Sequence, residues 1–82
     1  GMRCDSEGNL YITRHGKGTV VKISSKGTIE KEITLAGKKP SNLAFGGEDG
    51  RTVYVTLQES GNIESFRVDT PGREWRRKNN PL

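Results

Sequence analysis

Short apolar segments alternate with turn-forming residues along the whole chain. The segments are rich in β-branched and aromatic residues and are bounded by Gly, Asn, Asp or Ser, which is typical of strands joined by turns. This pattern predicts seven strands, over residues 2–5, 10–13, 20–24, 29–35, 42–45, 53–57 and 63–68. No helix is predicted, because apolar residues never recur at helical spacing over a long window.

The chain repeats itself. The sequence LYIT at 10–13 returns as VYVT at 53–56, an offset of 43 residues, and the same offset relates Val20 to Ile63. A strand-bearing repeat of about this length is typical of propeller blades, where each repeat is one small antiparallel sheet. We therefore predict an all-β fold of about two blades, four strands and then three.

The predicted strands divide the chain into three parts. Residues 1–39 are predicted to form the first blade, 40–70 a second, incomplete blade, and 71–82 a basic tail. A single repeat cannot bury its apolar face alone, and the last predicted strand is an edge with unpaired backbone groups. The chain is therefore expected to need neighbours. They can be further blades of a larger propeller or other copies that associate through exposed edge strands.

The fourth predicted strand alternates in the way expected of a strand with one side in water. One side of it would carry Ile29, Lys31, Ile33 and Leu35.

Composition indicates a thin core. Only 29% of the 82 residues are hydrophobic, and the mean hydropathy is −0.78. The single cysteine, Cys4, excludes an intrachain disulfide, and we interpret it as a small buried side chain of the first strand. No apolar run approaches the roughly 20 residues of a membrane span, so no membrane partner is expected.

The net charge of +4 is concentrated in two places. One is the pair Lys38 and Lys39, and the other is segment 73–82. The pattern favours a solvated loop and a solvated tail. Nucleic-acid binding is not expected, because no recognition helix, zinc module or aromatic sheet motif accompanies the charge.

Four residues are candidates for lining a pocket. The repeat aligns Met2 with Leu43, so Ser41 and Asn42 would begin the inner strand of the second blade at the channel mouth. The second strand runs antiparallel to the first and returns to the same end, which places Arg14 and His15 there. The alternative for all four is an ordinary role in turns. Gln58 and Glu59 are the repeat counterparts of this turn. No catalytic residue and no metal ligand is predicted.

Several segments together carry a resemblance to a known family. They include GMRCD at 1–5, GNLYIT at 8–13, GKKPSNLAFGG at 37–47 and DGRTVYVT at 49–56. The chain resembles the C-terminal portion of the senescence-marker-protein/gluconolactonase/regucalcin-like family. The resemblance implies a six-bladed β-propeller, of which this chain would supply about two blades.

The resemblance also implies an activity for intact members of the family. They are similar to metal-dependent hydrolases of sugar lactones and related esters, with calcium or zinc polarising the carbonyl and an aspartate managing the proton. That aspartate immediately precedes the Gly-Met with which this chain opens, and no family metal ligand falls on a residue present here. The chain alone is expected to be inactive and to hold no cofactor.

The alternative function is a non-catalytic module. Under this hypothesis several copies form a trimeric ring or an edge-paired dimer and bind a small polar ligand. Neither the substrate nor the cellular compartment is predicted.

Overall fold

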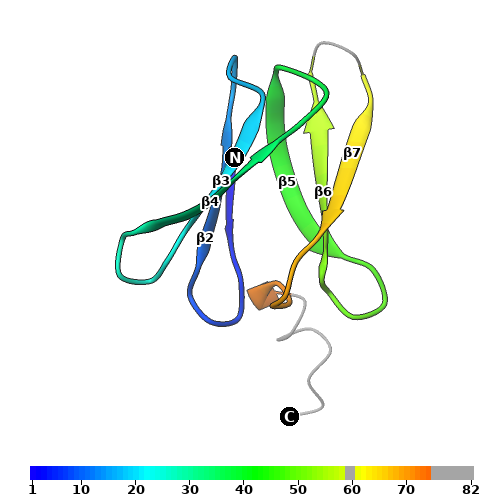
Figure 1. Ribbon diagram of the computed structural model, residues 1–82. Helices are drawn as coiled ribbons and strands as arrows, with labels where there is room; N and C mark the ends of the chain where they lie inside the picture. Colours follow the sequence, from blue (N-terminus) through cyan, green and yellow to red (C-terminus); the bar gives the residue numbers. More distant parts are fainter. Residues whose placement is uncertain (59–60, 75–82) are drawn as a thin grey trace.

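The computed structural model describes residues 1–58 and 61–74, which form two antiparallel sheets (Figure 1). The first sheet has the order β1-β2-β3-β4 and the second the order β5-β6-β7. The strands are β1 (Met2–Cys4), β2 (Leu10–Arg14), β3 (Thr19–Ile23), β4 (Ile29–Thr34), β5 (Pro40–Gly46), β6 (Thr52–Leu57) and β7 (Ile63–Arg67). Each strand pairs with its neighbour in sequence, so the predicted all-β meander of four strands and then three is confirmed.

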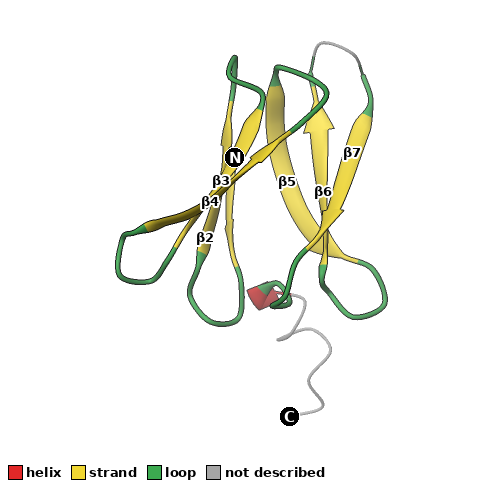
Figure 2. Cartoon of the chain, viewed as in Figure 1, coloured by secondary structure: helices red, strands yellow, loops and turns green. Residues whose placement is uncertain are grey.

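Little regular structure lies outside the strands. Arg73 and Glu74 adopt a helical turn at the end of the described chain (Figure 2). Most of the predicted basic tail, from residue 75 onward, and Glu59 lie outside the described residues. Within the described ranges, no helix has the length and apolarity needed to cross a bilayer.

The two sheets are arranged as neighbouring blades. The inner strands β1 and β5 contact each other, whereas β4 and β7 are the outermost strands of their sheets (Figure 1). The 14–18 and 35–39 turns lie at the end where β5 and β7 begin and β6 ends, which we call the upper end (Figure 1). This arrangement is that of two blades of a propeller.

Side chains alternate across each sheet, which gives four faces. In the first sheet we distinguish the Tyr11 face, which also carries Val20 and Ile33, from the Ile12 face. The Ile12 face carries Met2, Cys4, Leu10, Ile12, Val21 and Ile23. In the second sheet the Val55 face is distinguished from the Tyr54 face. The Val55 face carries Leu43, Phe45, Val53, Val55, Glu64 and Phe66, and the Tyr54 face carries Asn42, Ala44, Tyr54, Thr56, Ile63 and Ser65.

The core lies between the Tyr11 face and the Val55 face. Its buried side chains are Tyr11, Val20, Leu35, Leu43, Val53, Val55 and Leu57. Tyr11 packs edge to face on Phe45, with ring centroids 5.3 Å apart and planes at 83°. Such aromatic pairs contribute beyond the area that they bury. The contact between the two blades is therefore the hydrophobic core.

Glu64 fastens the blades at the upper end. Its two carboxylate oxygens accept hydrogen bonds from the backbone N–H groups of Ala36, at 2.9 Å, and Gly37, at 2.8 Å. Gly37 also lies so close to Leu57 that an added Cβ would come within 2.8 Å of its Cδ1. The turn between the blades is thus held to β6 and β7 by both polar and apolar contacts.

The segment 69–74 fastens the blades at the lower end. Pro71 accepts a hydrogen bond from the Ser6 N–H at 2.8 Å, and Gly72 donates to the Gly50 carbonyl at 3.1 Å. A Cβ added at Gly72 would lie 2.4 Å from Cβ of Phe45. This close approach requires glycine, because real Cβ atoms do not come so near another side chain.

Two details differ from the sequence-based expectation. The register between β3 and β4 shifts at Lys22/Ile23, so that Ile29 pairs with Ile23 although Lys31 pairs with Lys22. This bulge places Ile29 on the Ile12 face, opposite to the side predicted for it, because one extra residue inverts the alternation. Cys4 is half-buried rather than buried, since it lies on the same open face.

The buried hydroxyl of Tyr11 should make the free energy of unfolding fall at alkaline pH. Burial, followed by the nearby carboxylates of Asp5, Asp69 and Glu30, raises the pKa of Tyr11 from 10.0 to about 12. The unfolded chain therefore releases this proton at lower pH than the folded one. The corresponding stability is fully present below pH 10 and is lost as pH rises towards 12, by about 2–3 kcal/mol in total. Urea unfolding at a series of pH values around 10 measures this slope.

The matched control for this titration is Tyr11→Phe, which keeps the ring and removes the ionisable hydroxyl. Its unfolding free energy should fall less steeply over the same pH range. Equal slopes in the two proteins would show that Tyr11 does not resist ionisation.

Candidate functional site

Hydrogen bonds join the starts of the inner strands β1 and β5. The Gly1 ammonium donates to Oγ1 of Thr13 at 2.8 Å and to the carbonyl of Ser41 at 3.0 Å. In the second blade, Oγ of Ser41 lies 2.9 Å from Oγ1 of Thr56. A layer of small polar groups therefore crosses both blades where their inner strands begin.

The layer obeys the internal repeat. Thr13 and Thr56 are the last residues of LYIT and VYVT. Oγ1 of Thr13 donates to the Gly1 carbonyl at 3.2 Å, and Oγ1 of Thr56 donates to the Asn42 carbonyl at 3.4 Å. We did not single out these threonines from the sequence, although the repeated motif marks both.

The strand register agrees with the alignment of Met2 with Leu43 across the repeat. Met2 pairs with Ile12, and Leu43 pairs with Val55, its counterpart in the second blade. In this alignment Gly1 corresponds to Asn42. Ser41 therefore corresponds to the position just before Gly1.

Ser41 and Asn42 are both exposed at the start of β5. Oγ of Ser41 also donates to the Thr56 carbonyl at 3.3 Å, and Oδ1 of Asn42 accepts from the Leu43 N–H at 2.9 Å. The side chains are held by local contacts and remain open to solvent. They form the candidate site together with Thr13 and Thr56.

His15 lies in the adjacent turn and contacts its own repeat counterpart. Its Nε2 is 3.1 Å from Oε1 of Gln58. Backbone hydrogen bonds support the pair, from Gly16 to the Lys38 carbonyl at 2.9 Å and from Gln58 to the Lys39 carbonyl at 3.0 Å. The 14–18 turn, the 35–39 turn and Gln58 are thus joined by hydrogen bonds, and His15 is exposed there.

Arg14 lies apart from the other candidates. Alternation along β2 puts it on the Ile12 face, where its Nη1 is 3.1 Å from Oε2 of Glu32. The hydroxyl of Thr19 donates to the same oxygen at 2.8 Å. This hydroxyl, and to a lesser extent the charges of Lys17 and Arg14, hold the pKa of Glu32 below its usual value. Arg14 therefore belongs to a surface ion-pair cluster.

The described residues do not fit a divalent cation. No group of three or more His, Cys, Asp or Glu side chains among them could hold one. Three carboxylates already have other partners: Asp5 accepts from the Asn9 side chain and two N–H groups, Glu64 from two backbone N–H groups, and Asp49 from Arg67 at 2.6 Å. No reaction step through a metal is assigned to these residues.

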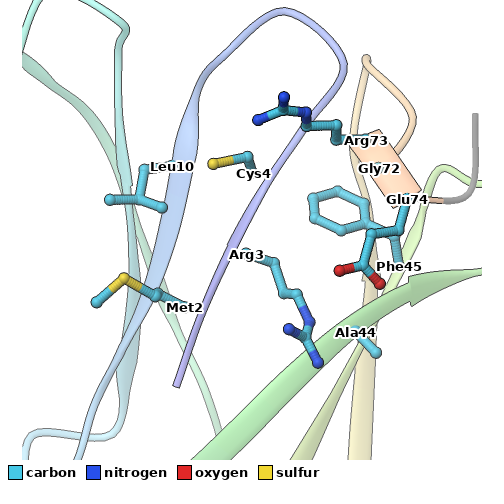
Figure 3. Close-up of a pocket in the computed structure, with 9 residues that line it drawn as sticks. All are labelled: Met2, Arg3, Cys4, Leu10, Ala44, Phe45, Gly72, Arg73 and Glu74. Atoms are coloured by element: carbon cyan, nitrogen blue, oxygen red, sulfur yellow. The ribbon is translucent and has the colours of Figure 1, made fainter. Parts of the chain in front are cut away.

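A pocket of about 290 Å³ follows the inner edge of β1. Figure 3 shows Met2, Cys4 and Leu10 on one side of β1, and Arg3 on the other side, towards Ala44. Phe45, Gly72, Arg73 and Glu74 complete the lining. The sequence did not predict this pocket. Gly72, Arg73 and Glu74 line one part of it, and nothing in the sequence indicated that this irregular segment packs against β1.

Comparison with known proteins identifies similar sequences. The model of the SMP-30/Gluconolactonase/LRE-like region matches residues 1–59. A 6-deoxy-6-sulfogluconolactonase of Pseudomonas putida is 33% identical over 85 residues, which cover 88% of this chain and 29% of that protein.

Two archaeal proteins are also similar. A pentonolactonase, XacC, of Haloferax volcanii is 36% identical over 56 residues, covering 68% of this chain and 19% of that protein. An uncharacterised protein of Sulfolobus acidocaldarius is 34% identical over 79 residues, covering 90% of this chain and 29% of that protein. The chain thus spans less than a third of the length of these relatives.

Proposed function

This chain belongs to the SMP-30/gluconolactonase/LRE-like family, and from that premise we propose that it forms two adjacent blades in the channel wall of a lactone hydrolase. The substrate class is a sugar lactone, by analogy with the two relatives named as lactonases. The proposal concerns a whole protein, of which these blades supply one part.

One observation carries the proposal. The inner strands β1 and β5 begin side by side, and the repeated threonines hydrogen-bond the start of each: Oγ1 of Thr13 donates to the Gly1 carbonyl and Oγ1 of Thr56 to the Asn42 carbonyl. Ser41 and Asn42 lie on this layer and are exposed. Hydroxyl and amide groups of this kind can hydrogen-bond the hydroxyls and ring oxygen of a sugar lactone. Their proposed role is to bind and orient the substrate.

The hydrolytic chemistry is assigned to other residues of the ring. In this proposal a divalent cation would supply the polarisation of the lactone carbonyl, but the described residues offer it no donor set. His15, paired with Gln58, would line the mouth outside the substrate layer.

A chimera tests the proposal. The segment of the Pseudomonas 6-deoxy-6-sulfogluconolactonase that aligns with this chain is replaced by the chain, and hydrolysis of that enzyme's lactone is followed. We expect the chimera to be active and the isolated chain, with calcium or zinc added, to leave the spontaneous rate unchanged. In the chimera, Ser41→Ala and Asn42→Ala should each lower kcat/KM by about tenfold, the usual scale for one lost hydrogen bond.

Ser65→Ala is the matched control, because Ser65 is an exposed serine in the middle of β7. It should leave kcat/KM unchanged. A folded but inactive chimera, or lactone hydrolysis by the isolated chain, would contradict the proposal.

A further inference from the structure

An arginine on the inner strand β1 occupies a register position that faces the core. Arg3 pairs with Tyr11, which is 1% exposed, so both residues lie on the Tyr11 face. Arg3 is nevertheless exposed, because β1 is the edge strand of its sheet and a long side chain can leave the core along that edge. Figure 3 shows its guanidinium directed towards Ala44 of β5. A positive charge therefore lies at the junction of the two inner strands.

Packing alone does not account for this arginine. Its counterpart in the second blade is Ala44, which pairs with Tyr54 as Arg3 pairs with Tyr11. The repeat thus accepts a methyl group at the same place on the inner strand. The two blades differ there by one exposed charge.

The charge of Arg3 is not neutralised within the described ranges 1–58 and 61–74. Of the three arginines in the strands of those ranges, Arg14 pairs with Glu32 at 3.1 Å and Arg67 with Asp49 at 2.6 Å. The Arg3 side chain makes no hydrogen bond or ion pair with the described residues. This holds although Glu74 lines the same 290 Å³ pocket.

Arg3 lies close to the residues proposed to bind the lactone. It lines a hollow of about 160 Å³ together with Asn42 and Thr56. It follows Gly1 by two residues, or about 7 Å of strand. Gly1 in turn abuts Asn42, because a Cβ added at Gly1 would overlap the Asn42 side chain. A sugar lactone held on Asn42 would therefore have its substituents within reach of the guanidinium.

We propose that Arg3 binds an anionic substituent of the lactone and so determines which lactones the channel accepts. A guanidinium forms paired, charge-assisted hydrogen bonds with a carboxylate, sulfate or phosphate group. Ser41 and Asn42 would bind the uncharged part of the sugar. The inference rests on the proposed function, to which it adds the charge of the substrate and the residue that recognises it.

Binding of sugars that cannot be hydrolysed tests this role in the chimera described above. Calorimetry compares glucose with glucose 6-phosphate, glucose 6-sulfate and glucuronate. At least one of the three anionic sugars should bind about 10–100-fold more tightly than glucose, the scale of hydrogen bonds to a charged group. The sugar that binds most tightly identifies the anionic group. Equal affinities for glucose and all three anionic sugars overturn the inference.

Arg3→Gln should remove this preference by weakening the anionic sugar about 10–100-fold while leaving the affinity for glucose unchanged. Arg3→Lys keeps the charge without the paired donors and should retain part of the preference. Arg73→Gln is the matched control. Arg73 is also exposed and lines the same pocket, but it lies at the Cys4 end of β1 (Figure 3). It should leave every affinity unchanged.

Binding and hydrolysis together separate this inference from the proposed function. If the chimera is inactive but Arg3→Gln still removes the preference, the proposed function is contradicted and the role of Arg3 is supported. If the chimera is active but Arg3→Gln changes all affinities equally, or none, the inference is overturned and the proposed function stands. Loss of the preference in Arg73→Gln as well would also overturn it. Circular dichroism verifies that each variant is folded.

Discussion

Tyr11→Ala is expected to lower the free energy of unfolding by about 3–5 kcal/mol, the range for deleting a buried aromatic side chain. Tyr11 is 1% exposed and packs on Phe45 in the middle of the contact between the blades. A domain of this size has a stability on the order of 0.05–0.15 kcal/mol per residue. The loss is thus a large part of the total, and the variant should be substantially unfolded at room temperature.

The repeat supplies the matched control for this change. Tyr54 occupies the same position in the second blade but is 43% exposed. Tyr54→Ala should cost less than about 1 kcal/mol, as surface substitutions do. Urea unfolding followed by circular dichroism gives both values. Equal losses would mean that the contact between the blades is not the core.

The strands and the repeat were predictable because each depends on local pattern. Period-two alternation and turn residues located all seven strands, and the alignment of Met2 with Leu43 agrees with the observed register. The pattern could not tell which tyrosine would be buried. Tyr11 and Tyr54 stand in nearly identical local sequences, and their environments differ only because one faces the neighbouring blade.

The bulge in β4 shows a second limit of local pattern. Ile29 and Ile33 alternate as if they shared one face. The tight turn after β3 sets the register of the pair, and the extra residue beside Ile23 turns Ile29 to the other face. A bulge depends on how two strands meet, which alternation within one strand does not record.

The contacts around the predicted pocket residues could not be predicted from the sequence. The antiparallel return of β2 brings His15 to the upper end, where it contacts Gln58, its counterpart at the offset of 43 residues. Arg14 could have been separated from this group, since alternation from Ile12 places it on the Ile12 face. Whether Ser41, Asn42, His15 or Arg14 binds a ligand stays a prediction.

Asp5→Ala is expected to lower the free energy of unfolding by about 2–4 kcal/mol. Asp5 is fully buried. One of its carboxylate oxygens accepts from the N–H groups of Glu7 and Asn9, both at 2.9 Å, and the other accepts from Nδ2 of Asn9 at 2.8 Å. The substitution would leave these donors without their acceptor. The backbone bridge from Asp5 to Gly72 links the same turn to the lower fastening of the blades, so the whole lower end should loosen.

Asp49→Ala is the control, because Asp49 accepts a similar turn hydrogen bond but is not buried. Asp49 also accepts a hydrogen bond from the N–H two residues later, that of Arg51, at 3.0 Å. Its side chain is 44% exposed, however, and Arg67, followed by this N–H, lowers the pKa of Asp49 to about 2. Because water can replace the carboxylate there, the loss should be much smaller than for Asp5→Ala. Thermal and urea unfolding of both variants, with hydrogen exchange at the Glu7 and Asn9 amides, make the comparison. Equal losses, or unchanged protection of those amides in Asp5→Ala, would show that the buried carboxylate does not hold the lower end together.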